Sequence, residues 1–156
     1  MTINTTNLNE ARKQIQKLKK ENKPVIVRAQ DEEFNRKVLE ILGVDILLSP
    51  EIHNRKDKLK QRDSGLNEHL CRLAKENNVK IAIDISELQK LDKKEKAKAL
   101  ARIMQNIMLS KKTNAKIILY PENKYKKQDV LSFFLSLKGS TQMAKSAVST
   151  LHKQIK

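Results

Sequence analysis

The residues best suited to chemistry in this sequence are the basic side chains of one long polar segment, residues 51–63 (EIHNRKDKLKQRD). Between its two end residues the segment holds one acid, Asp57, and a group of cations: Arg55, Lys56, Lys58, Lys60 and Arg62. Guanidinium and ammonium groups at this density bind phosphate oxygens. The segment therefore predicts a site for a polyanion such as RNA or DNA, and the alternative is a solvated loop that only maintains solubility.

A second basic segment follows near the C-terminal end, at residues 122–128 (ENKYKKQ). Lys124, Lys126 and Lys127 surround Tyr125 there, and we expect them on the same rim of the protein as the first segment. Tyr125 has two interpretations, a ring that stacks on a nucleic-acid base and a ring that anchors the segment by packing. The three lysines are candidate phosphate contacts under either interpretation.

Candidate catalytic groups are few. Asp84 ends a predicted strand, where a barrel enzyme places a general base or metal ligand, and a helix cap or salt bridge is the alternative. A two-metal phosphoesterase needs several acids and histidines from different strand ends, and the other predicted strands end without them. His69 and Cys71 stand two apart on a predicted helix and face different directions. We expect no catalytic residue, no metal and no cofactor in this chain.

The overall composition agrees with a polyanion partner. The 156 residues carry 33 Lys and Arg against 18 Asp and Glu, a net charge of +15, and 38% of them are hydrophobic. A single domain spanning residues 1–156 is long enough to bury a core. The chain contains no apolar run of membrane-spanning length and no apolar signal core at its start, and Cys71 is its only cysteine. We expect a cytoplasmic protein that does not bind membranes.

The elements that must position these residues follow from hydrophobic spacing. Helical periodicity predicts helices at residues 7–22, 31–42, 65–78, 92–112, 129–137 and 141–156, with Asp31 and Ser64 as caps. In the fourth helix the predicted apolar face contains Ala97, Leu100, Ala101, Met104, Ile107 and Met108. Runs rich in β-branched residues predict strands at 24–29, 44–50, 79–85 and 115–120, with a turn at 86–91.

Single helices between successive strands indicate parallel pairing through right-handed crossovers, an α/β fold with helices covering the sheet. An eight-unit barrel needs about 250 residues, so four strands do not close one. The basic segment at residues 51–63 then leaves the C-terminal end of a strand, the edge at which such folds hold ligands. At least one edge of the sheet stays open and requires a cover, either the N-terminal helix or another protein.

Several motifs along the chain resemble one family, the archaeal ribonuclease P protein component 3, the thirty-kilodalton subunit family of ribonuclease P. The shared features are the strand VDILLSP at 44–50, the tetrad NRKD at 54–57, RDSGLN at 62–67 and LAKENNVKIAI at 73–83. DEEFNRKVLE at 31–40 and GSTQMAKSAVS at 139–149 resemble helices of that family. The resemblance covers about residues 24–151, and residues 1–23 form an N-terminal helical segment before it.

The resemblance implies a TIM-barrel-like fold in a noncatalytic, RNA-binding subunit of a ribonucleoprotein that acts in tRNA processing. It implies contact with ribonuclease P RNA, which removes the 5′ leader of precursor tRNA using its own magnesium ions, so that precursor tRNA is an indirect partner. It also implies pairing with ribonuclease P protein component 2 and assembly with the other protein components. Under this reading Arg55, Lys56 and Arg62 contact RNA, and a second group braces the loop: Asn54, Asp57, Asp63 and Asn67.

The sequence departs from longer members of that family in two places. We expect it to lack the first one or two strand-helix units, and it inserts DKLKQ, residues 57–61, between the NRK and RDSG elements. We therefore expect a shortened or incomplete barrel. Two other functions fit the residues less well: a metal-dependent phosphoesterase on a barrel-like scaffold, and a general nucleic-acid-binding α/β protein unconnected with tRNA.

Overall fold

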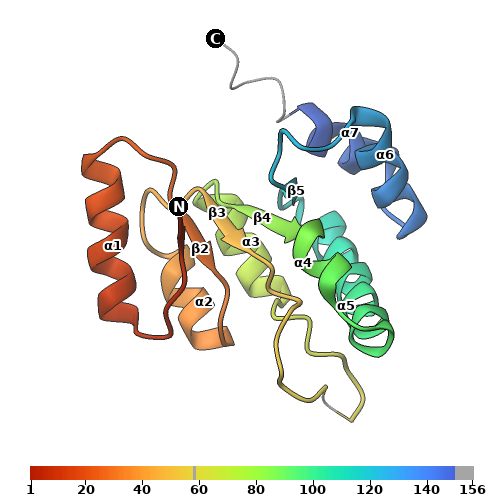
Figure 1. Cartoon of the computed structure of the whole chain (residues 1–156), viewed down its shortest axis with the longest axis horizontal. Helices are drawn as coiled ribbons and strands as arrows, with labels where there is room; N and C mark the ends of the chain where they lie inside the picture. Colours follow the sequence, from red (N-terminus) through yellow and green to blue (C-terminus); the bar gives the residue numbers. More distant parts are fainter. Residues whose placement is uncertain (58, 150–156) are drawn as a thin grey trace.

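A parallel sheet forms the centre of the computed structural model, which describes residues 1–57 and 59–149 (Figure 1). Its strands lie in chain order, and within the described residues each pairs only with its sequence neighbours. They are β1 (Thr2–Ile3), β2 (Ile26–Arg28), β3 (Ile46–Leu48), β4 (Lys80–Asp84) and β5 (Ile117–Tyr120). Because β1 and β5 do not pair with each other, the sheet is open. The prediction of an α/β, TIM-barrel-like incomplete barrel is confirmed.

Helices follow the strands and cover one face of the sheet. They are α1 (Leu8–Lys20), α2 (Glu32–Leu39), α3 (Glu68–Glu76), α4 (Ile85–Lys90), α5 (Lys93–Thr113), α6 (Lys127–Ser136) and α7 (Thr141–Ser149). Asn7, Asp31 and Asp92 accept first-turn backbone N–H groups and so begin α1, α2 and α5. Within the described residues no helix is long and apolar enough to span a membrane.

Three local predictions were wrong. Strand β1 was not expected, because its two residues carry no alternation; parallel pairing with β2 and the burial of Ile3 in the core place them in the sheet. Residues 86–91 were predicted as a turn, but α4 forms there because Asp84 caps it. The third helix begins after Asn67, whose side chain accepts from Leu70 N at 2.9 Å, and not after Ser64. The predicted C-terminal helix at 141–156 extends past the described residues.

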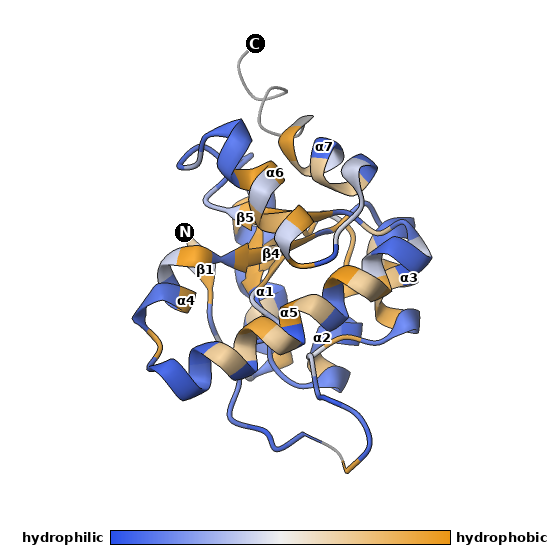
Figure 2. Ribbon diagram, turned by 90° about the vertical axis from the view of Figure 1, so that its right-hand side faces the viewer, coloured by the Kyte–Doolittle hydropathy of each residue, from blue (hydrophilic) through white to orange (hydrophobic). Residues whose placement is uncertain are grey.

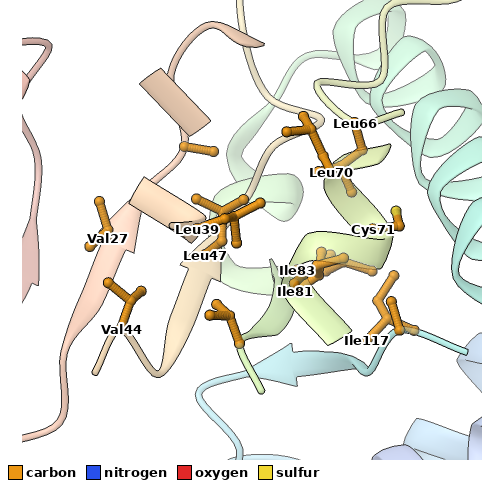
Figure 3. Packing of buried hydrophobic residues seen from close by; sticks show 14 of the residues in the cluster. Val27, Leu39, Val44, Leu47, Leu66, Leu70, Cys71, Ile81, Ile83 and Ile117 are labelled. Carbon is orange, nitrogen blue, oxygen red and sulfur yellow. The ribbon is translucent and has the colours of Figure 1, made fainter. Parts of the chain in front are cut away.

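The main core lies between the sheet and the helices. Strand residues Val27, Leu47, Ile81, Ile83 and Ile117 project toward helix residues that include Leu39, Leu70 and Cys71 (Figure 3). Burying one such aliphatic side chain contributes about 1.5–3 kcal/mol. The opposite face of the sheet holds a smaller buried cluster, made of Ile26, Ile46, Leu48, Ala82 and Ile118. This inner face corresponds to the interior of a barrel that the described strands do not close.

Helix α5 buries a different face from the predicted one. Met108, predicted in the core, is 63% exposed, and Ala97 is exposed as well. The buried face is partly polar and contains Ala99, Arg102, Ile103, Asn106, Ile107 and Ser110. A helix turns about 100° per residue, so a shift of the buried face by one or two positions exchanges apolar for polar side chains. The polar residues of this face contact the long basic segment.

Candidate nucleic-acid interface

The basic segment at residues 51–63, called the basic loop below, projects from the body of the protein between β3 and α3 (Figures 1 and 2). Its base is held by Arg102 of α5, whose side chain is 2% exposed. The guanidinium donates to the backbone oxygens of Glu51 at 3.2 Å, His53 at 3.1 Å and Arg55 at 2.9 Å. It also donates to Asp57 Oδ1 at 3.0 Å. The Arg102 side chain thus fixes the path of the first half of the loop, residues 51–57.

The two halves of the loop are joined by its aspartates. Asp57 Oδ1 accepts from Asp63 N at 2.9 Å, and Asp63 accepts from Arg55 Nε at 2.9 Å and from Gly65 N at 3.0 Å. Partial burial opposes ionisation of Asp63, but the hydrogen bonds from Arg55 and Gly65 and the nearby positive charge together outweigh it, and the pKa of Asp63 lies below its usual value. Gly65 has φ +76°, and a Cβ there would lie 2.0 Å from Pro50 O.

The predicted RNA contacts in the basic loop fall into two groups. Lys56, Lys60 and Arg62 are exposed and form no ion pair within residues 1–57 and 59–149. Arg55 is 34% exposed, pairs with Asp63 and donates to Gln30 O at 3.0 Å, so much of its guanidinium is occupied within the protein. Lys58 lies outside the described residues. Three free cations therefore face solvent on a loop that other residues hold in shape.

The residues predicted to brace the loop also differ in position. Asp57 and Asp63 lie within the hydrogen bonds just described, and Asn67 caps α3 while donating to Glu32. Asn54 is exposed, and its side chain makes no hydrogen bond to the described part of the protein. Asp57, Asp63 and Asn67 thus have the partners that bracing needs, whereas Asn54 does not.

The second basic segment follows β5, whose C-terminal end lies at the same edge of the sheet as that of β3. Lys124 Nζ donates to Ser86 Oγ at 2.9 Å and lies 5.9 Å from the centre of the Tyr125 ring. Tyr125 packs against the main core, which favours the packing-anchor interpretation. Lys126 and Lys127, at the start of α6, are exposed. RNA contact by these three lysines stays a prediction.

A buried acid lies beneath the basic loop. Glu51 is 0% exposed, and neither of its carboxylate oxygens has a hydrogen-bond partner among the described residues. Burial raises its pKa to about 8, against the weaker effects of its own backbone N–H and of the Arg28 charge. Arg28 is itself paired with Glu87, with Nη2 at 2.7 Å from Oε1. Asp84 caps α4 by accepting from Ser86 N at 2.9 Å, as the cap interpretation predicted.

In the described ranges, no three His, Cys, Asp or Glu side chains lie close enough together to hold a metal ion. Sequence reasoning missed both Arg102 and Glu51. The signal for Arg102 was its position three residues from Ala99 and four from Asn106, on one face of a helix.

These features define a class, an open parallel α/β barrel with a braced basic loop at its ligand-binding edge. Among known proteins, the chain is similar to ribonuclease P protein component 3. That of Methanococcus maripaludis is 32% identical over 117 residues, which are 75% of this chain and 47% of the relative. That of Methanocaldococcus jannaschii is 28% identical over 155 residues, 97% of this chain and 64% of the relative.

A solved structure gives the same result. A chain of an archaeal ribonuclease P determined by cryo-EM with mature tRNA matches with a TM-score of 0.77 and 25% identity, over 97% of this chain and 64% of that chain. No profile of a described protein family matches the sequence. The chain spans about half the length of the first curated relatives. The resemblance to ribonuclease P protein component 3 indicated by the motifs is confirmed.

Proposed function

We propose that this chain is a noncatalytic RNA-binding protein of ribonuclease P that contacts the catalytic RNA through the basic loop. The observation that carries the proposal is the set of unpaired cations, Lys56, Lys60 and Arg62, on a loop held by buried Arg102. Because the loop that carries these side chains is already ordered, its backbone loses little conformational freedom when they bind phosphates. The component 3 relatives and the structural match to a chain of ribonuclease P support the choice of RNA.

Salt dependence of RNA binding tests the proposal. If about 5–8 phosphates are neutralised, the slope of log affinity against log salt is roughly −4 to −7. Replacing Lys56, Lys60 and Arg62 together by Ala should make this slope shallower by about 2–3, because each contact releases close to one counterion. A matched control replaces Lys13, Lys17 and Lys20, exposed on α1, and removes the same charge. Equal losses in both variants would contradict a specific role for the loop.

The identity of the RNA separates this function from the general nucleic-acid-binding alternative. The protein is purified from its native cells at low salt, and the RNA that accompanies it is sequenced. Enrichment of ribonuclease P RNA over total RNA is expected. A broad mixture of RNAs would instead favour a general nucleic-acid-binding protein, and absence of RNA with intrinsic phosphatase activity would favour the phosphoesterase.

The open sheet supplies the argument for a protein partner. Strands β1 and β5 each have one neighbour in the described sheet, and unpaired strand edges promote association unless they are covered. Helix α1 packs against α2 and β1, at the other end of the sheet from the unpaired side of β5. We propose that ribonuclease P protein component 2 covers this side, as the family resemblance suggests, with an interface of at least about 1,000 Å².

Size-exclusion chromatography with light scattering tests the pairing. The protein alone should elute as an association-prone monomer, and a mixture with component 2 should elute together at a defined mass. A well-behaved monomer that ignores component 2 at micromolar concentrations would overturn the proposed pairing without affecting the RNA measurements.

A further inference from the structure

A pocket of about 290 Å³ lies far from the basic loop, between the end of α5 and the start of α7. It is lined at one side by Lys116 and Ile117, where β5 begins, whereas the basic loop follows the end of β3. The two sites thus lie at opposite ends of a parallel sheet, and Figures 1 and 2 show α7 and the basic loop on opposite sides of the molecule. The function proposed above does not use this pocket.

The charge of the pocket is positive. Lys111 and Lys116 line it, and no Asp or Glu belongs to its lining. Lys111 Nζ donates to Lys138 O at 3.3 Å, and Lys116 forms no ion pair with any described residue. The remaining polar lining consists of hydroxyl and amide side chains, which donate hydrogen bonds without adding negative charge.

The start of α7 adds backbone donors. Ser140 accepts from Met143 N through Oγ at 3.1 Å and from Ala144 N through its backbone oxygen at 3.0 Å. The amides of Thr141 and Gln142 donate to no group among the described residues, as is usual in the first turn of a helix. The first turn of α7 contains no acid, so its positive dipole end is not neutralised there.

An independent observation indicates a missing ligand. Ser110 lines the pocket and is 1% exposed, yet its Oγ has no hydrogen-bond partner among the described residues. A serine in a helix can donate to the backbone oxygen four residues earlier, and a buried hydroxyl without a partner lowers stability. This hydroxyl is available to a hydrogen-bond acceptor in the pocket.

We propose that this pocket binds one phosphate group, held by Ser110, Lys116 and the first amides of α7. A tetrahedral anion with several acceptor oxygens matches a positive pocket whose polar side chains can all donate hydrogen bonds. The phosphate comes either from an RNA backbone, which would then contact both ends of the sheet, or from a free phosphate ester. The chemistry of recognition is the same for both.

NMR titration of the ¹⁵N-labelled full chain with sodium phosphate, against sodium chloride at equal ionic strength, tests the site. The Thr141 and Gln142 amide signals should shift with phosphate and not with chloride. Ser110→Ala and Lys116→Ala should each weaken the phosphate response by about threefold to tenfold. Lys94→Ala, which removes an exposed lysine from α5 outside the pocket, should leave it unchanged.

Ser110→Ala also separates binding from stability. Without phosphate its melting temperature should equal or exceed that of the parent, because the change removes an unpartnered buried hydroxyl. Addition of RNA then distinguishes the two sources. If RNA shifts the Thr141 and Gln142 amide signals and phosphate displaces that RNA, the bound group is a backbone phosphate. If these signals shift with phosphate but not with RNA, the bound group is a free phosphate ester. Signals that respond to neither, or equally to chloride, would overturn the site.

Discussion

Arg102 of α5 and Asp57 of the basic loop are 45 residues apart in the chain and are joined by a hydrogen bond of 3.0 Å between Nη2 and Oδ1. The same guanidinium also donates to three backbone oxygens of the loop. A long helix buried against the sheet therefore determines where the cations of the loop are presented. Under the proposed function, the stability of the protein and its affinity for RNA should be coupled through this one side chain.

Arg102→Met should destabilise the protein by about 3 kcal/mol, because it leaves the buried oxygen of Glu51, the partly buried oxygens of His53 and Arg55, and Asp57 without their donor. Urea unfolding measures the change. Lys98→Met on the same helix is the control: Lys98 is half-buried and its one ion pair among the described residues is with Glu95, so its loss should cost less than about 0.5 kcal/mol. Similar midpoints for the two variants would show that Arg102 does not hold the loop.

A comparison of Arg55→Ala with Lys56→Ala should distinguish a residue that holds the shape of the loop from a residue that contacts RNA. Arg55→Ala removes the partner of Asp63 and should lower the melting temperature, whereas exposed Lys56→Ala should leave it nearly unchanged. Both should weaken RNA binding, but only Lys56→Ala should reduce the salt slope by close to one without a change in stability. Thermal melts and filter binding of the two variants, side by side, measure these effects. A stable Arg55→Ala protein would contradict the bracing role.

Glu51 should make stability depend on pH. Its folded-state pKa of about 8 exceeds the ordinary value of 4.5, so between these values the unfolded chain releases a proton that the folded protein retains. The free energy of unfolding contributed by this group therefore falls as pH rises from about 4.5 to about 8 and is constant above that.

Glu51→Gln replaces the carboxyl by a neutral amide of the same shape, which does not titrate. Its stability should match that of the parent near pH 4 and exceed it increasingly up to about pH 8. Urea denaturation at several pH values provides the measurement. Asp57 and Asp63, whose pKa values are lowered, affect both proteins alike at acidic pH. Parallel stability curves across the whole range would disprove the assignment of a buried, neutral Glu51.

Asp84→Asn should leave the stability of the protein nearly unchanged and the rate of tRNA processing within a few fold of normal. Asparagine caps a helix as well as aspartate, and the hydrogen bonds of the Asp84 side chain in the described structure are those it accepts from the Ser86 and Glu87 amides. Reconstituted ribonuclease P with the variant chain provides the assay, and Asp84→Ala, expected to cost about 1 kcal/mol, is the structural control. A rate loss of about 10³ with the fold intact would indicate a catalytic carboxylate.

Local patterns in the sequence predicted most of the elements. The strands β2 to β5 and the helices α1, α2, α3 and α5 form where hydrophobic spacing placed them, because periods of two and 3.6 residues follow from the backbone geometry of each element. The position of the basic loop after β3 also followed from the sequence, because parallel strands place their C-terminal ends at one edge. The family resemblance came from contiguous motifs and was therefore visible without a structure.

The structure alone decided which of the basic residues are free and what holds them. Arg55 is occupied by Asp63 and Gln30, and Arg102 binds oxygens of Glu51, His53 and Arg55. Backbone oxygens are the same in every residue, so a side chain that binds them leaves no complementary residue type in the sequence to reveal the contact. The pocket at α7 was hidden for the same reason, since its donors include backbone amides and a serine whose burial depends on how α5 and α7 pack.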